Sequence, residues 1–155
     1  MRGSFAKYFS KDTGEKTGIR SPKEVFLSTS HKGTIRGMHY QQPPHSGQKL
    51  VIVLEGEVLD VVVSLVSGPT FGRIHYFELS ADQKFLLHVP NGYAHGFQVR
   101  SDTASLLYIT DHEFSASADT GVRWDSLGID WPLAPTSISQ RDQGLALFDP
   151  KQEYF

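Results

Sequence analysis

Short runs rich in β-branched and aromatic residues, separated by turn signals, constrain the fold more than any other feature. Most of the turn signals combine glycine with serine, asparagine, lysine or glutamate. No long stretch between them has helical periodicity with caps, so alternating β/α architectures are disfavoured. The pattern predicts an all-β class, a barrel or jelly roll. The predicted strands are Glu24–Ser30, Thr34–Gln41, Lys49–Leu54, Glu57–Val66, Arg73–Leu79, Phe85–Val89, Ala94–Arg100 and Ala104–His112.

The two ends of the chain lack this pattern. Residues 1–23 are polar, and we expect a loop or an edge hairpin there. After His112 the sequence is irregular, but it contains residues apolar enough to pack as a lid or buttress: Trp124, Leu127, Ile129, Trp131 and Leu133. The length of 155 residues predicts a single domain over 1–155.

Charge and composition exclude several classes of partner. The formal net charge is −2, and the scattered Lys and Arg form no basic face, so we expect no nucleic-acid partner. No apolar run approaches the roughly 20 residues of a membrane span, and the N-terminus lacks the apolar core of a signal peptide. The absence of cysteine excludes disulfides and thiolate metal sites. We therefore expect a cytoplasmic protein with no membrane partner.

The segment Thr34–Pro44 predicts a strand whose far end carries chemistry. In a regular strand Arg36 and His39, three residues apart, would point to opposite faces. A bulge at Gly37 would bring both to one side. The alternative is a half-exposed strand with a surface arginine and histidine.

Asp60 is a carboxylate within an otherwise apolar strand. Even and odd positions of Glu57–Val66 are both largely apolar, which indicates a strand covered on both sides. Asp60 then needs a hydrogen-bond partner or an open cavity. The alternative is a solvated Asp near a strand end.

The stretch Pro90-Asn-Gly-Tyr-Ala-His95 matches Pro-x-Gly-x-x-His, the second signature of cupin barrels. In metal cupins this histidine is one ligand, and further histidines and a glutamate complete the site. Here the earlier strand offers only His39, and the other histidines are dispersed. We therefore predict no metal. The alternative for His95 is a hydrogen-bonded interior histidine.

Further motifs occur together in a fixed order. They are Arg36-Gly-Met-His-Tyr-Gln41, Pro43-Pro44, Gln48-Lys-Leu-Val51, Gly56-Glu-Val-Leu-Asp-Val61, Pro69-Thr-Phe-Gly72, Pro90-x-Gly-x-Ala-His-Gly-Phe97, Gly121-Val-Arg-Trp-Asp125 and Ile129-Asp-Trp-Pro132.

From about Arg2 to Asp142 the chain resembles the dTDP-4-dehydrorhamnose 3,5-epimerase family of nucleotide-sugar epimerases. The resemblance implies a cupin-type jelly roll with a short irregular C-terminal segment, a homodimer, and no metal or other cofactor. It also implies a role in deoxysugar or surface-polysaccharide biosynthesis, such as that of lipopolysaccharide O-antigen.

The implied reaction is epimerisation of a nucleotide-linked 4-keto-6-deoxyhexose, whose C4 ketone acidifies the hydrogens on C3 and C5. It requires a base, an acid on the opposite face of the sugar, and a cation near the enolate oxygen. By resemblance His39 is the base, Asp142 orients it, Lys49 is the cation and Tyr108 is the acid. The alternative for Tyr108 is a core tyrosine.

The resemblance also implies a nucleotide site. Arg36 resembles the family's phosphate-binding arginine, Arg2 and Phe5 resemble the N-terminal segment that holds the nucleotide, and Phe114 falls where an aromatic residue lies beside the base. His95 and Asp60 are further candidates for substrate binding.

Departures from the family pattern gather on the nucleotide side. They leave open a dTDP-, CDP- or GDP-linked substrate, and the departures are Lys7, Glu24, Phe26 and Ile52. The longer loop His112–Asp119 leaves open inversion at C3, at C5 or at both. A 3,4-ketoisomerase and an inactive sugar-nucleotide-binding cupin are the alternative functions.

Overall fold

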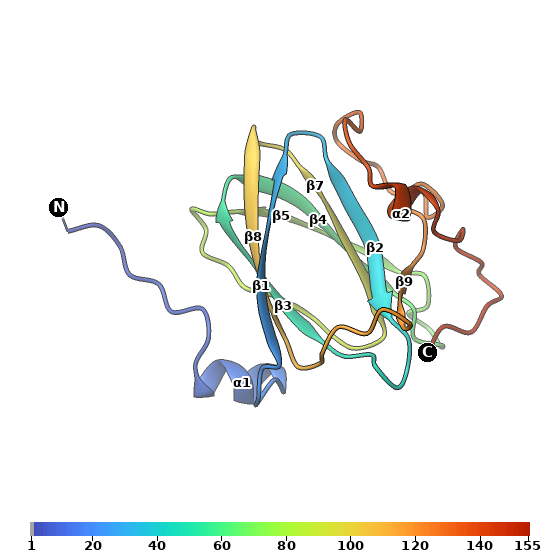
Figure 1. The fold of residues 1–155 in the computed structure, drawn as a ribbon, viewed down its shortest axis with the longest axis horizontal. Coiled ribbons are helices and arrows are strands. Elements are labelled where there is room, and N and C mark those ends of the chain that lie inside the picture. Colours follow the sequence, from blue (N-terminus) through green and yellow to red (C-terminus); the bar gives the residue numbers. More distant parts are fainter. Residues whose placement is uncertain (1) are drawn as a thin grey trace.

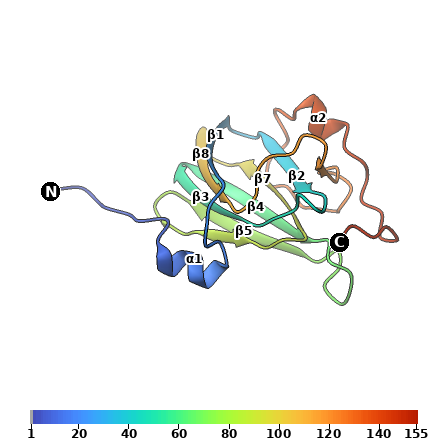
Figure 2. The same cartoon turned by 60° about the horizontal axis from the view of Figure 1, so that its bottom comes forward.

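The computed structural model describes residues 2–155, which form two antiparallel β-sheets packed face to face (Figures 1 and 2). The all-β, cupin-type prediction is confirmed. One sheet has four strands in the order β1 (Glu24–His31), β8 (Thr103–Thr110), β3 (Lys49–Glu55) and β6 (Leu87–Val89). The other has five, in the order β5 (Ile74–Ser80), β4 (Glu57–Ser64), β7 (Tyr93–Val99), β2 (Ile35–Gln41) and β9 (Asp119–Gly121).

All of the predicted strands are present, with shifts of a few residues at their ends. The predicted strand Phe85–Val89 is reduced to Leu87–Val89, because Phe85 and Leu86 precede the pairing with β3. The sequence pattern missed β9, whose three residues pair only with the end of β2. Three residues are too few to show an alternating pattern.

The prediction of a loop or hairpin for residues 1–23 is wrong, because helix α1 (Lys11–Thr17) lies there. The Ser10 hydroxyl caps it by accepting from the Thr13 N–H at 3.3 Å, and Gly18 ends it with a φ of 83°. Only seven residues long, the helix is too short to show a 3.6-residue period. Next to it, Ile19 packs against Ile52 on the outer face of the four-stranded sheet. Ile52, one of the departures from the family pattern, therefore packs on the outside of the sheet and does not line the cavity described below.

The core lies between the two sheets, and a second apolar layer covers the outside of the five-stranded sheet. Strand β4 serves both layers: Val58 and Val62 belong to the central core, whereas Leu59, Val61 and Val63 belong to the outer layer. The prediction of a strand covered on both sides is confirmed.

The outer layer is supplied by the C-terminal segment, which crosses the back of the five-stranded sheet. The buttress prediction is thus confirmed for Leu127, Ile129 and Trp131. The segment also contains helix α2 (Gln140–Gln143), which lies beside β2 (Figure 1). Within residues 2–155, neither helix has the length or apolar character needed to cross a bilayer.

One buried side chain joins this segment to the sheet. The Gln98 amide donates to the carbonyl of Leu133 at 2.8 Å and accepts from the Leu133 N–H at 3.0 Å. Gln98 has no exposed surface. These two hydrogen bonds therefore attach the C-terminal segment to the sheet at a point where the segment forms no strand.

We predict that Gln98→Leu lowers the free energy of unfolding by about 1–3 kcal/mol, because the N–H and C=O of Leu133 lose their buried partner. Urea unfolding monitored by tryptophan fluorescence measures this change. Gln152→Leu, at an exposed position, is the matched control. A Gln98→Leu protein as stable as the control would contradict the anchoring role.

Candidate active site

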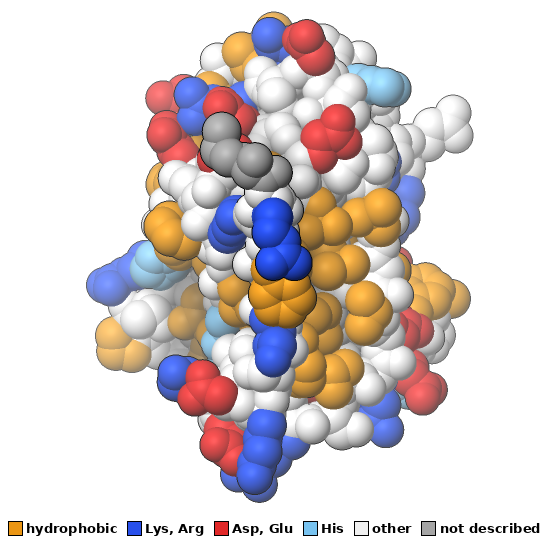
Figure 3. Space-filling model, turned by 90° about the vertical axis from the view of Figure 1, so that its left-hand side faces the viewer, with side chains coloured by type: hydrophobic (Ala, Val, Ile, Leu, Met, Phe, Trp, Pro, Cys, Tyr) orange, Lys and Arg blue, Asp and Glu red, His pale blue; other side chains and the backbone are white. Residues whose placement is uncertain are grey.

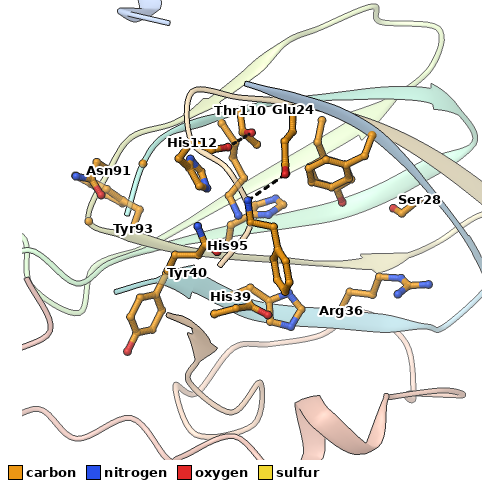
Figure 4. A pocket seen from close by; sticks show the side chains of 18 of the residues that line it. Glu24, Ser28, Arg36, His39, Tyr40, Asn91, Tyr93, His95, Thr110 and His112 are labelled. Carbon is orange, nitrogen blue, oxygen red and sulfur yellow. Dashed lines mark hydrogen bonds between the residues drawn. The ribbon is translucent and has the colours of Figure 1, made fainter. Parts of the chain in front are cut away.

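A cavity of about 280 Å³ opens between the two sheets. Both sheets line it, and its wall is completed by the loop before β9 and by residues near the C-terminus (Figure 4). The residues predicted from sequence that line it are Arg36, His39, Lys49, His95, Tyr108 and Phe114.

Arg36 and His39 reach the same cavity because β2 contains an extra residue. Arg36 pairs with Phe97 and His39 with His95, so three steps along β2 match two along β7. At the irregularity Gly37 has a φ of 139°, and a Cβ atom there would lie 2.6 Å from the Cα of Gly96. Only glycine fits, and the predicted bulge is confirmed.

His39 is held by Asp142. The His39 Nε2 and the Asp142 Oδ1 are 2.7 Å apart, and the Asp142 side chain is only 3% exposed. A carboxylate accepts hydrogen bonds, so Nε2 carries the proton and Nδ1 is left as the basic nitrogen. The structure thus brings together the two residues predicted to act as base and orienting carboxylate.

Local backbone structure fixes that carboxylate. The Gly37 N–H donates to Asp142 Oδ2 at 3.1 Å, and the Ser139 hydroxyl caps α2 by accepting from the Asp142 N–H at 3.0 Å. Burial alone would raise the pKa of Asp142, but the hydrogen bonds and the charge of His39 outweigh it and hold this pKa below its ordinary value. Asp142 is therefore ionised at neutral pH and its orientation is fixed.

A second histidine–aspartate pair lies next to the first. His95 Nε2 and Asp60 Oδ2 are 2.8 Å apart, and both side chains are buried. Burial lowers the pKa of His95 despite the attraction of Asp60, so a neutral His95 faces the cavity. The alternative of a solvated Asp60 is wrong. The interpretation of His95 as an interior, hydrogen-bonded histidine is correct. His95 also lines the cavity, so this interpretation does not exclude contact with a substrate.

Asp60 supports the site from behind and does not line it. Within residues 2–155, its second oxygen, Oδ1, is buried without a hydrogen-bond partner. Its negative charge acts on Lys49, which lies partly buried in the cavity wall. Burial lowers the pKa of Lys49 to about 8, and Asp60 and Asp119 oppose that change.

Tyr108 faces the cavity from the other sheet. Its ring stacks on Phe26 with centroids 4.8 Å apart and meets His95 edge-on at 6.3 Å. Burial raises the pKa of Tyr108, so the hydroxyl keeps its proton across the neutral range. Tyr108 belongs to the central core and also lines the cavity, so the two interpretations of it do not exclude each other.

Two of the residues predicted to hold the nucleotide, Arg36 and Phe114, line the cavity. The Arg36 Nε donates to the Ser30 hydroxyl at 2.8 Å. The Phe114 N–H donates to Glu24 at 3.1 Å, which ties the loop before β9 to β1. Glu24 and Phe26, two departures from the family pattern, thus line this cavity.

Arg2 and Phe5 are not brought to the cavity of their own chain. Both are exposed, in an extended segment that projects away from the sheets (Figures 1 and 2). Their role in nucleotide binding stays a prediction.

Several residues that line the cavity were not identified from sequence. Arg141 and Asp119 form an ion pair at 2.7 Å that joins α2 to β9. Tyr40, Tyr93 and Phe155 also border the cavity, and the Tyr40 ring points away from it (Figure 4). For Arg141 the sequence offered one signal, its position directly before Asp142. The sequence offered no signal for the other residues, because only the fold brings them to the cavity.

Among residues 2–155, no group of three or more His, Asp or Glu side chains is placed to hold a metal ion. His39 and His95 each use one ring nitrogen on an aspartate instead. That the reaction needs no metal stays a prediction.

Comparisons with known proteins agree with this geometry. Residues 1–149 match the family model described as dTDP-4-dehydrorhamnose 3,5-epimerase. The enzyme of that name from Shigella flexneri is 38% identical over 148 residues, covering 91% of this chain and 81% of the relative.

Two solved structures show the same fold. The dTDP-4-dehydrorhamnose 3,5-epimerase from Bacillus anthracis, with TDP and PPi bound, gives a TM-score of 0.90 at 37% identity, covering 95% of this chain and 87% of that one. A 3'-monoepimerase from Streptomyces bikiniensis, in complex with dTDP-quinovose, gives a TM-score of 0.84 at 26% identity, covering 91% of this chain and 74% of that one.

The match extends over nearly the whole sequence, and the solved structures share its two-sheet architecture. On these grounds the chain belongs to the dTDP-4-dehydrorhamnose 3,5-epimerase family.

Proposed function

We propose that this protein epimerises a nucleotide-linked 4-keto-6-deoxyhexose by general acid–base proton transfer, without a metal, in deoxysugar biosynthesis. The observation that carries this proposal is the placement of the His39–Asp142 pair, Lys49 and Tyr108 around one cavity. A base, a cation and an acid are the groups that the reaction requires.

The two proton-transfer groups belong to opposite sheets. His39 lies on β2 of the five-stranded sheet, and Tyr108 lies on β8 of the four-stranded sheet. A sugar bound between them exposes one face to each. This arrangement supports inversion, because a proton removed from one face is replaced from the other.

In the proposed sequence of steps, His39 Nδ1 takes the proton from the carbon next to the ketone. The electron pair of that C–H bond forms the enolate, whose negative oxygen is stabilised by the Lys49 cation. The Tyr108 hydroxyl then gives its proton to the opposite face of the same carbon. Exchange with solvent returns a proton to Tyr108 and removes one from His39.

For the nucleotide, we propose thymidine diphosphate, because a relative of this fold binds TDP. The Arg36 guanidinium suits a diphosphate, since its planar donors match paired phosphate oxygens. We propose that Phe114, an exposed ring on the cavity wall, stacks on the base, and that Arg2 and Phe5 also contribute. Inversion at C3 alone and at both C3 and C5 fit this site equally, and a cytoplasmic location remains our expectation.

We also propose that the protein is a homodimer. Strand β1 is an edge strand of the four-stranded sheet, and its side chains Val25 and Leu27 are 61% and 56% exposed. Hydrophobic side chains are also exposed on the side from which the N-terminal arm projects (Figure 3). An exposed apolar edge is a surface that a second copy can cover.

The decisive test is incubation with 4-keto-6-deoxy sugar nucleotides in deuterated water, followed by mass spectrometry and product analysis. His39→Ala should abolish both deuterium uptake and epimer formation, because no enolate forms without a base. Tyr108→Phe should lose inversion while exchange on the face of His39 survives. Each loss should be about 10²–10⁴-fold, the range that acid–base groups control.

Matched controls for these variants are His75→Ala and Tyr76→Phe, at exposed positions outside the cavity. Both should react as the wild type does. Full inversion by His39→Ala would refute the proposed base, and a wild-type protein inert toward every 4-keto-6-deoxy substrate would refute the function.

We predict that kcat falls as the pH rises through about 8, because the Lys49 cation is lost above its pKa of about 8. The sign follows from the charge: lysine is cationic below its pKa and neutral above it. Tyr108 cannot account for the fall, because burial raises its pKa. Pre-steady-state or saturating rates measured from pH 6 to 10 show the effect.

Lys49→Met should remove this alkaline limb and lower kcat at pH 7 by about 10²–10³-fold, the usual effect of losing one group that stabilises an oxyanion. Lys23→Met, at an exposed position outside the cavity, is the control. An unchanged alkaline limb in Lys49→Met would show that another group titrates.

The dimer is tested by replacing Leu27 with glutamate, which places a charge on the apolar edge. Leu27→Glu should convert the dimer to a monomer in sedimentation velocity. Leu147→Glu has a matched exposure of 55% outside β1 and should remain dimeric. A monomeric wild type would refute the proposed homodimer.

A further inference from the structure

Strand β1 presents a row of side chains to the cavity from the edge of its sheet. Its even-numbered residues Glu24, Phe26 and Ser28 line the cavity (Figure 4 labels the first and the last). The odd-numbered Val25 and Leu27 are exposed and do not line it. Among the described residues β1 pairs only with β8. The row therefore closes the cavity at the edge of the four-stranded sheet.

Within this row, Phe26 lies directly opposite Tyr108 in the pairing of β1 with β8. The two rings are stacked, with centroids 4.8 Å apart and planes only 12° from parallel. Directly opposite side chains are close neighbours across a sheet, and aromatic pairs in this position attract each other. The Phe26 ring therefore covers one face of the Tyr108 ring.

The other neighbours of Tyr108 lie in the interior. Val51 of β3 lies opposite it on its other side, within the central core, and His95 of the facing sheet meets it edge-on at 6.3 Å. Val51 and His95 are both buried, whereas Phe26 is 45% exposed. Tyr108 itself is only 7% exposed. Phe26 is thus the neighbour that separates the Tyr108 ring from solvent at the edge of the sheet.

The proposed reaction makes two demands on the Tyr108 hydroxyl. It must stay protonated until the enolate forms, and it must then meet the face of the carbon opposite to His39. Burial satisfies the first demand, because it raises the pKa of Tyr108. The second depends on packing, because a tyrosine hydroxyl lies in the plane of its ring and moves only with it.

We infer that Phe26 is a positioning residue, which holds the Tyr108 ring by stacking so that the hydroxyl delivers its proton to the second face of the sugar. This inference rests on the proposed function. Phe26 acts through Tyr108 and transfers no proton itself. It is also one of the positions at which this chain departs from the family pattern.

The test separates inversion from exchange on the face of His39, with dTDP-linked 4-keto-6-deoxyglucose in deuterated water. In Phe26→Ala, inversion should slow by about tenfold, the upper end of what one aromatic pair contributes. Exchange with retention should change by less than about twofold, because His39 and Lys49 keep their places. A loss of folded protein would lower both rates together, so the ratio of the two rates is the measured quantity.

Two further variants make the result specific. Phe26→Tyr keeps a planar ring and should bring inversion back to within about twofold of the wild-type rate. Phe85→Ala removes a phenylalanine that is 60% exposed and lies outside the cavity, and it should leave both rates unchanged. Thermal unfolding of each variant confirms that it is folded.

A double variant tests whether Phe26 acts through the hydroxyl of Tyr108. In Tyr108→Phe no hydroxyl remains to be positioned, so adding Phe26→Ala should slow the residual inversion by less than about twofold. A further loss of about tenfold would show that the two residues act independently, and it would overturn the inference.

The inference is also overturned by unchanged inversion in Phe26→Ala, by equal losses of inversion and exchange, or by failure of Phe26→Tyr to restore inversion. A Kd for dTDP that Phe26→Ala raises by about threefold or more would make Phe26 a nucleotide contact instead. These results concern Phe26 alone, since they require an active wild type. A wild type that turns over no 4-keto-6-deoxy substrate refutes the proposed function, and the role of Phe26 with it.

Discussion

The carboxylate of Asp142 is the group on which the site depends. It accepts from the Gly37 N–H on one oxygen and from His39 on the other, so it joins α2 to β2 across more than a hundred residues of sequence. The first contact is with the bulge that turns Arg36 and His39 to one side; the second fixes the tautomer of the base. One buried charge therefore sets both the position of the C-terminal segment and the chemistry of the histidine.

Around this group the two sheets make different contributions. The five-stranded sheet carries His39 and His95, each paired with an aspartate, and the four-stranded sheet carries Lys49 and Tyr108. Burial shifts the pKa values of the last two in opposite directions. It lowers the pKa of Lys49 to about 8 and raises the pKa of Tyr108. The same apolar surroundings thus keep an acid protonated and bring a cation close to the point where it loses its charge.

Most of the fold was predictable, because the strands carry their own pattern. Strand β4 is apolar at both odd and even positions and is covered on both sides, and Gly37 marked the bulge. Helix α1 was missed because two turns give no period. The partner of Asp60 could not be inferred, because Val62, not Asp60, pairs with His95 and the contact depends on the register of β4 against β7. Residues such as Arg141 and Phe155 reach the cavity only through the path of the C-terminal segment, which has no regular pattern to read.

The wall of the cavity is built from parts of the chain that lie far apart in the sequence. Strand β1 and the loop it holds through Glu24 form one part of the wall, whereas Arg141 and Phe155 of the C-terminal segment belong to another. Neither part supplies His39, Lys49 or Tyr108. Substitutions in either part, Phe26 excepted, can therefore reshape the wall of the cavity while the reacting groups keep their places.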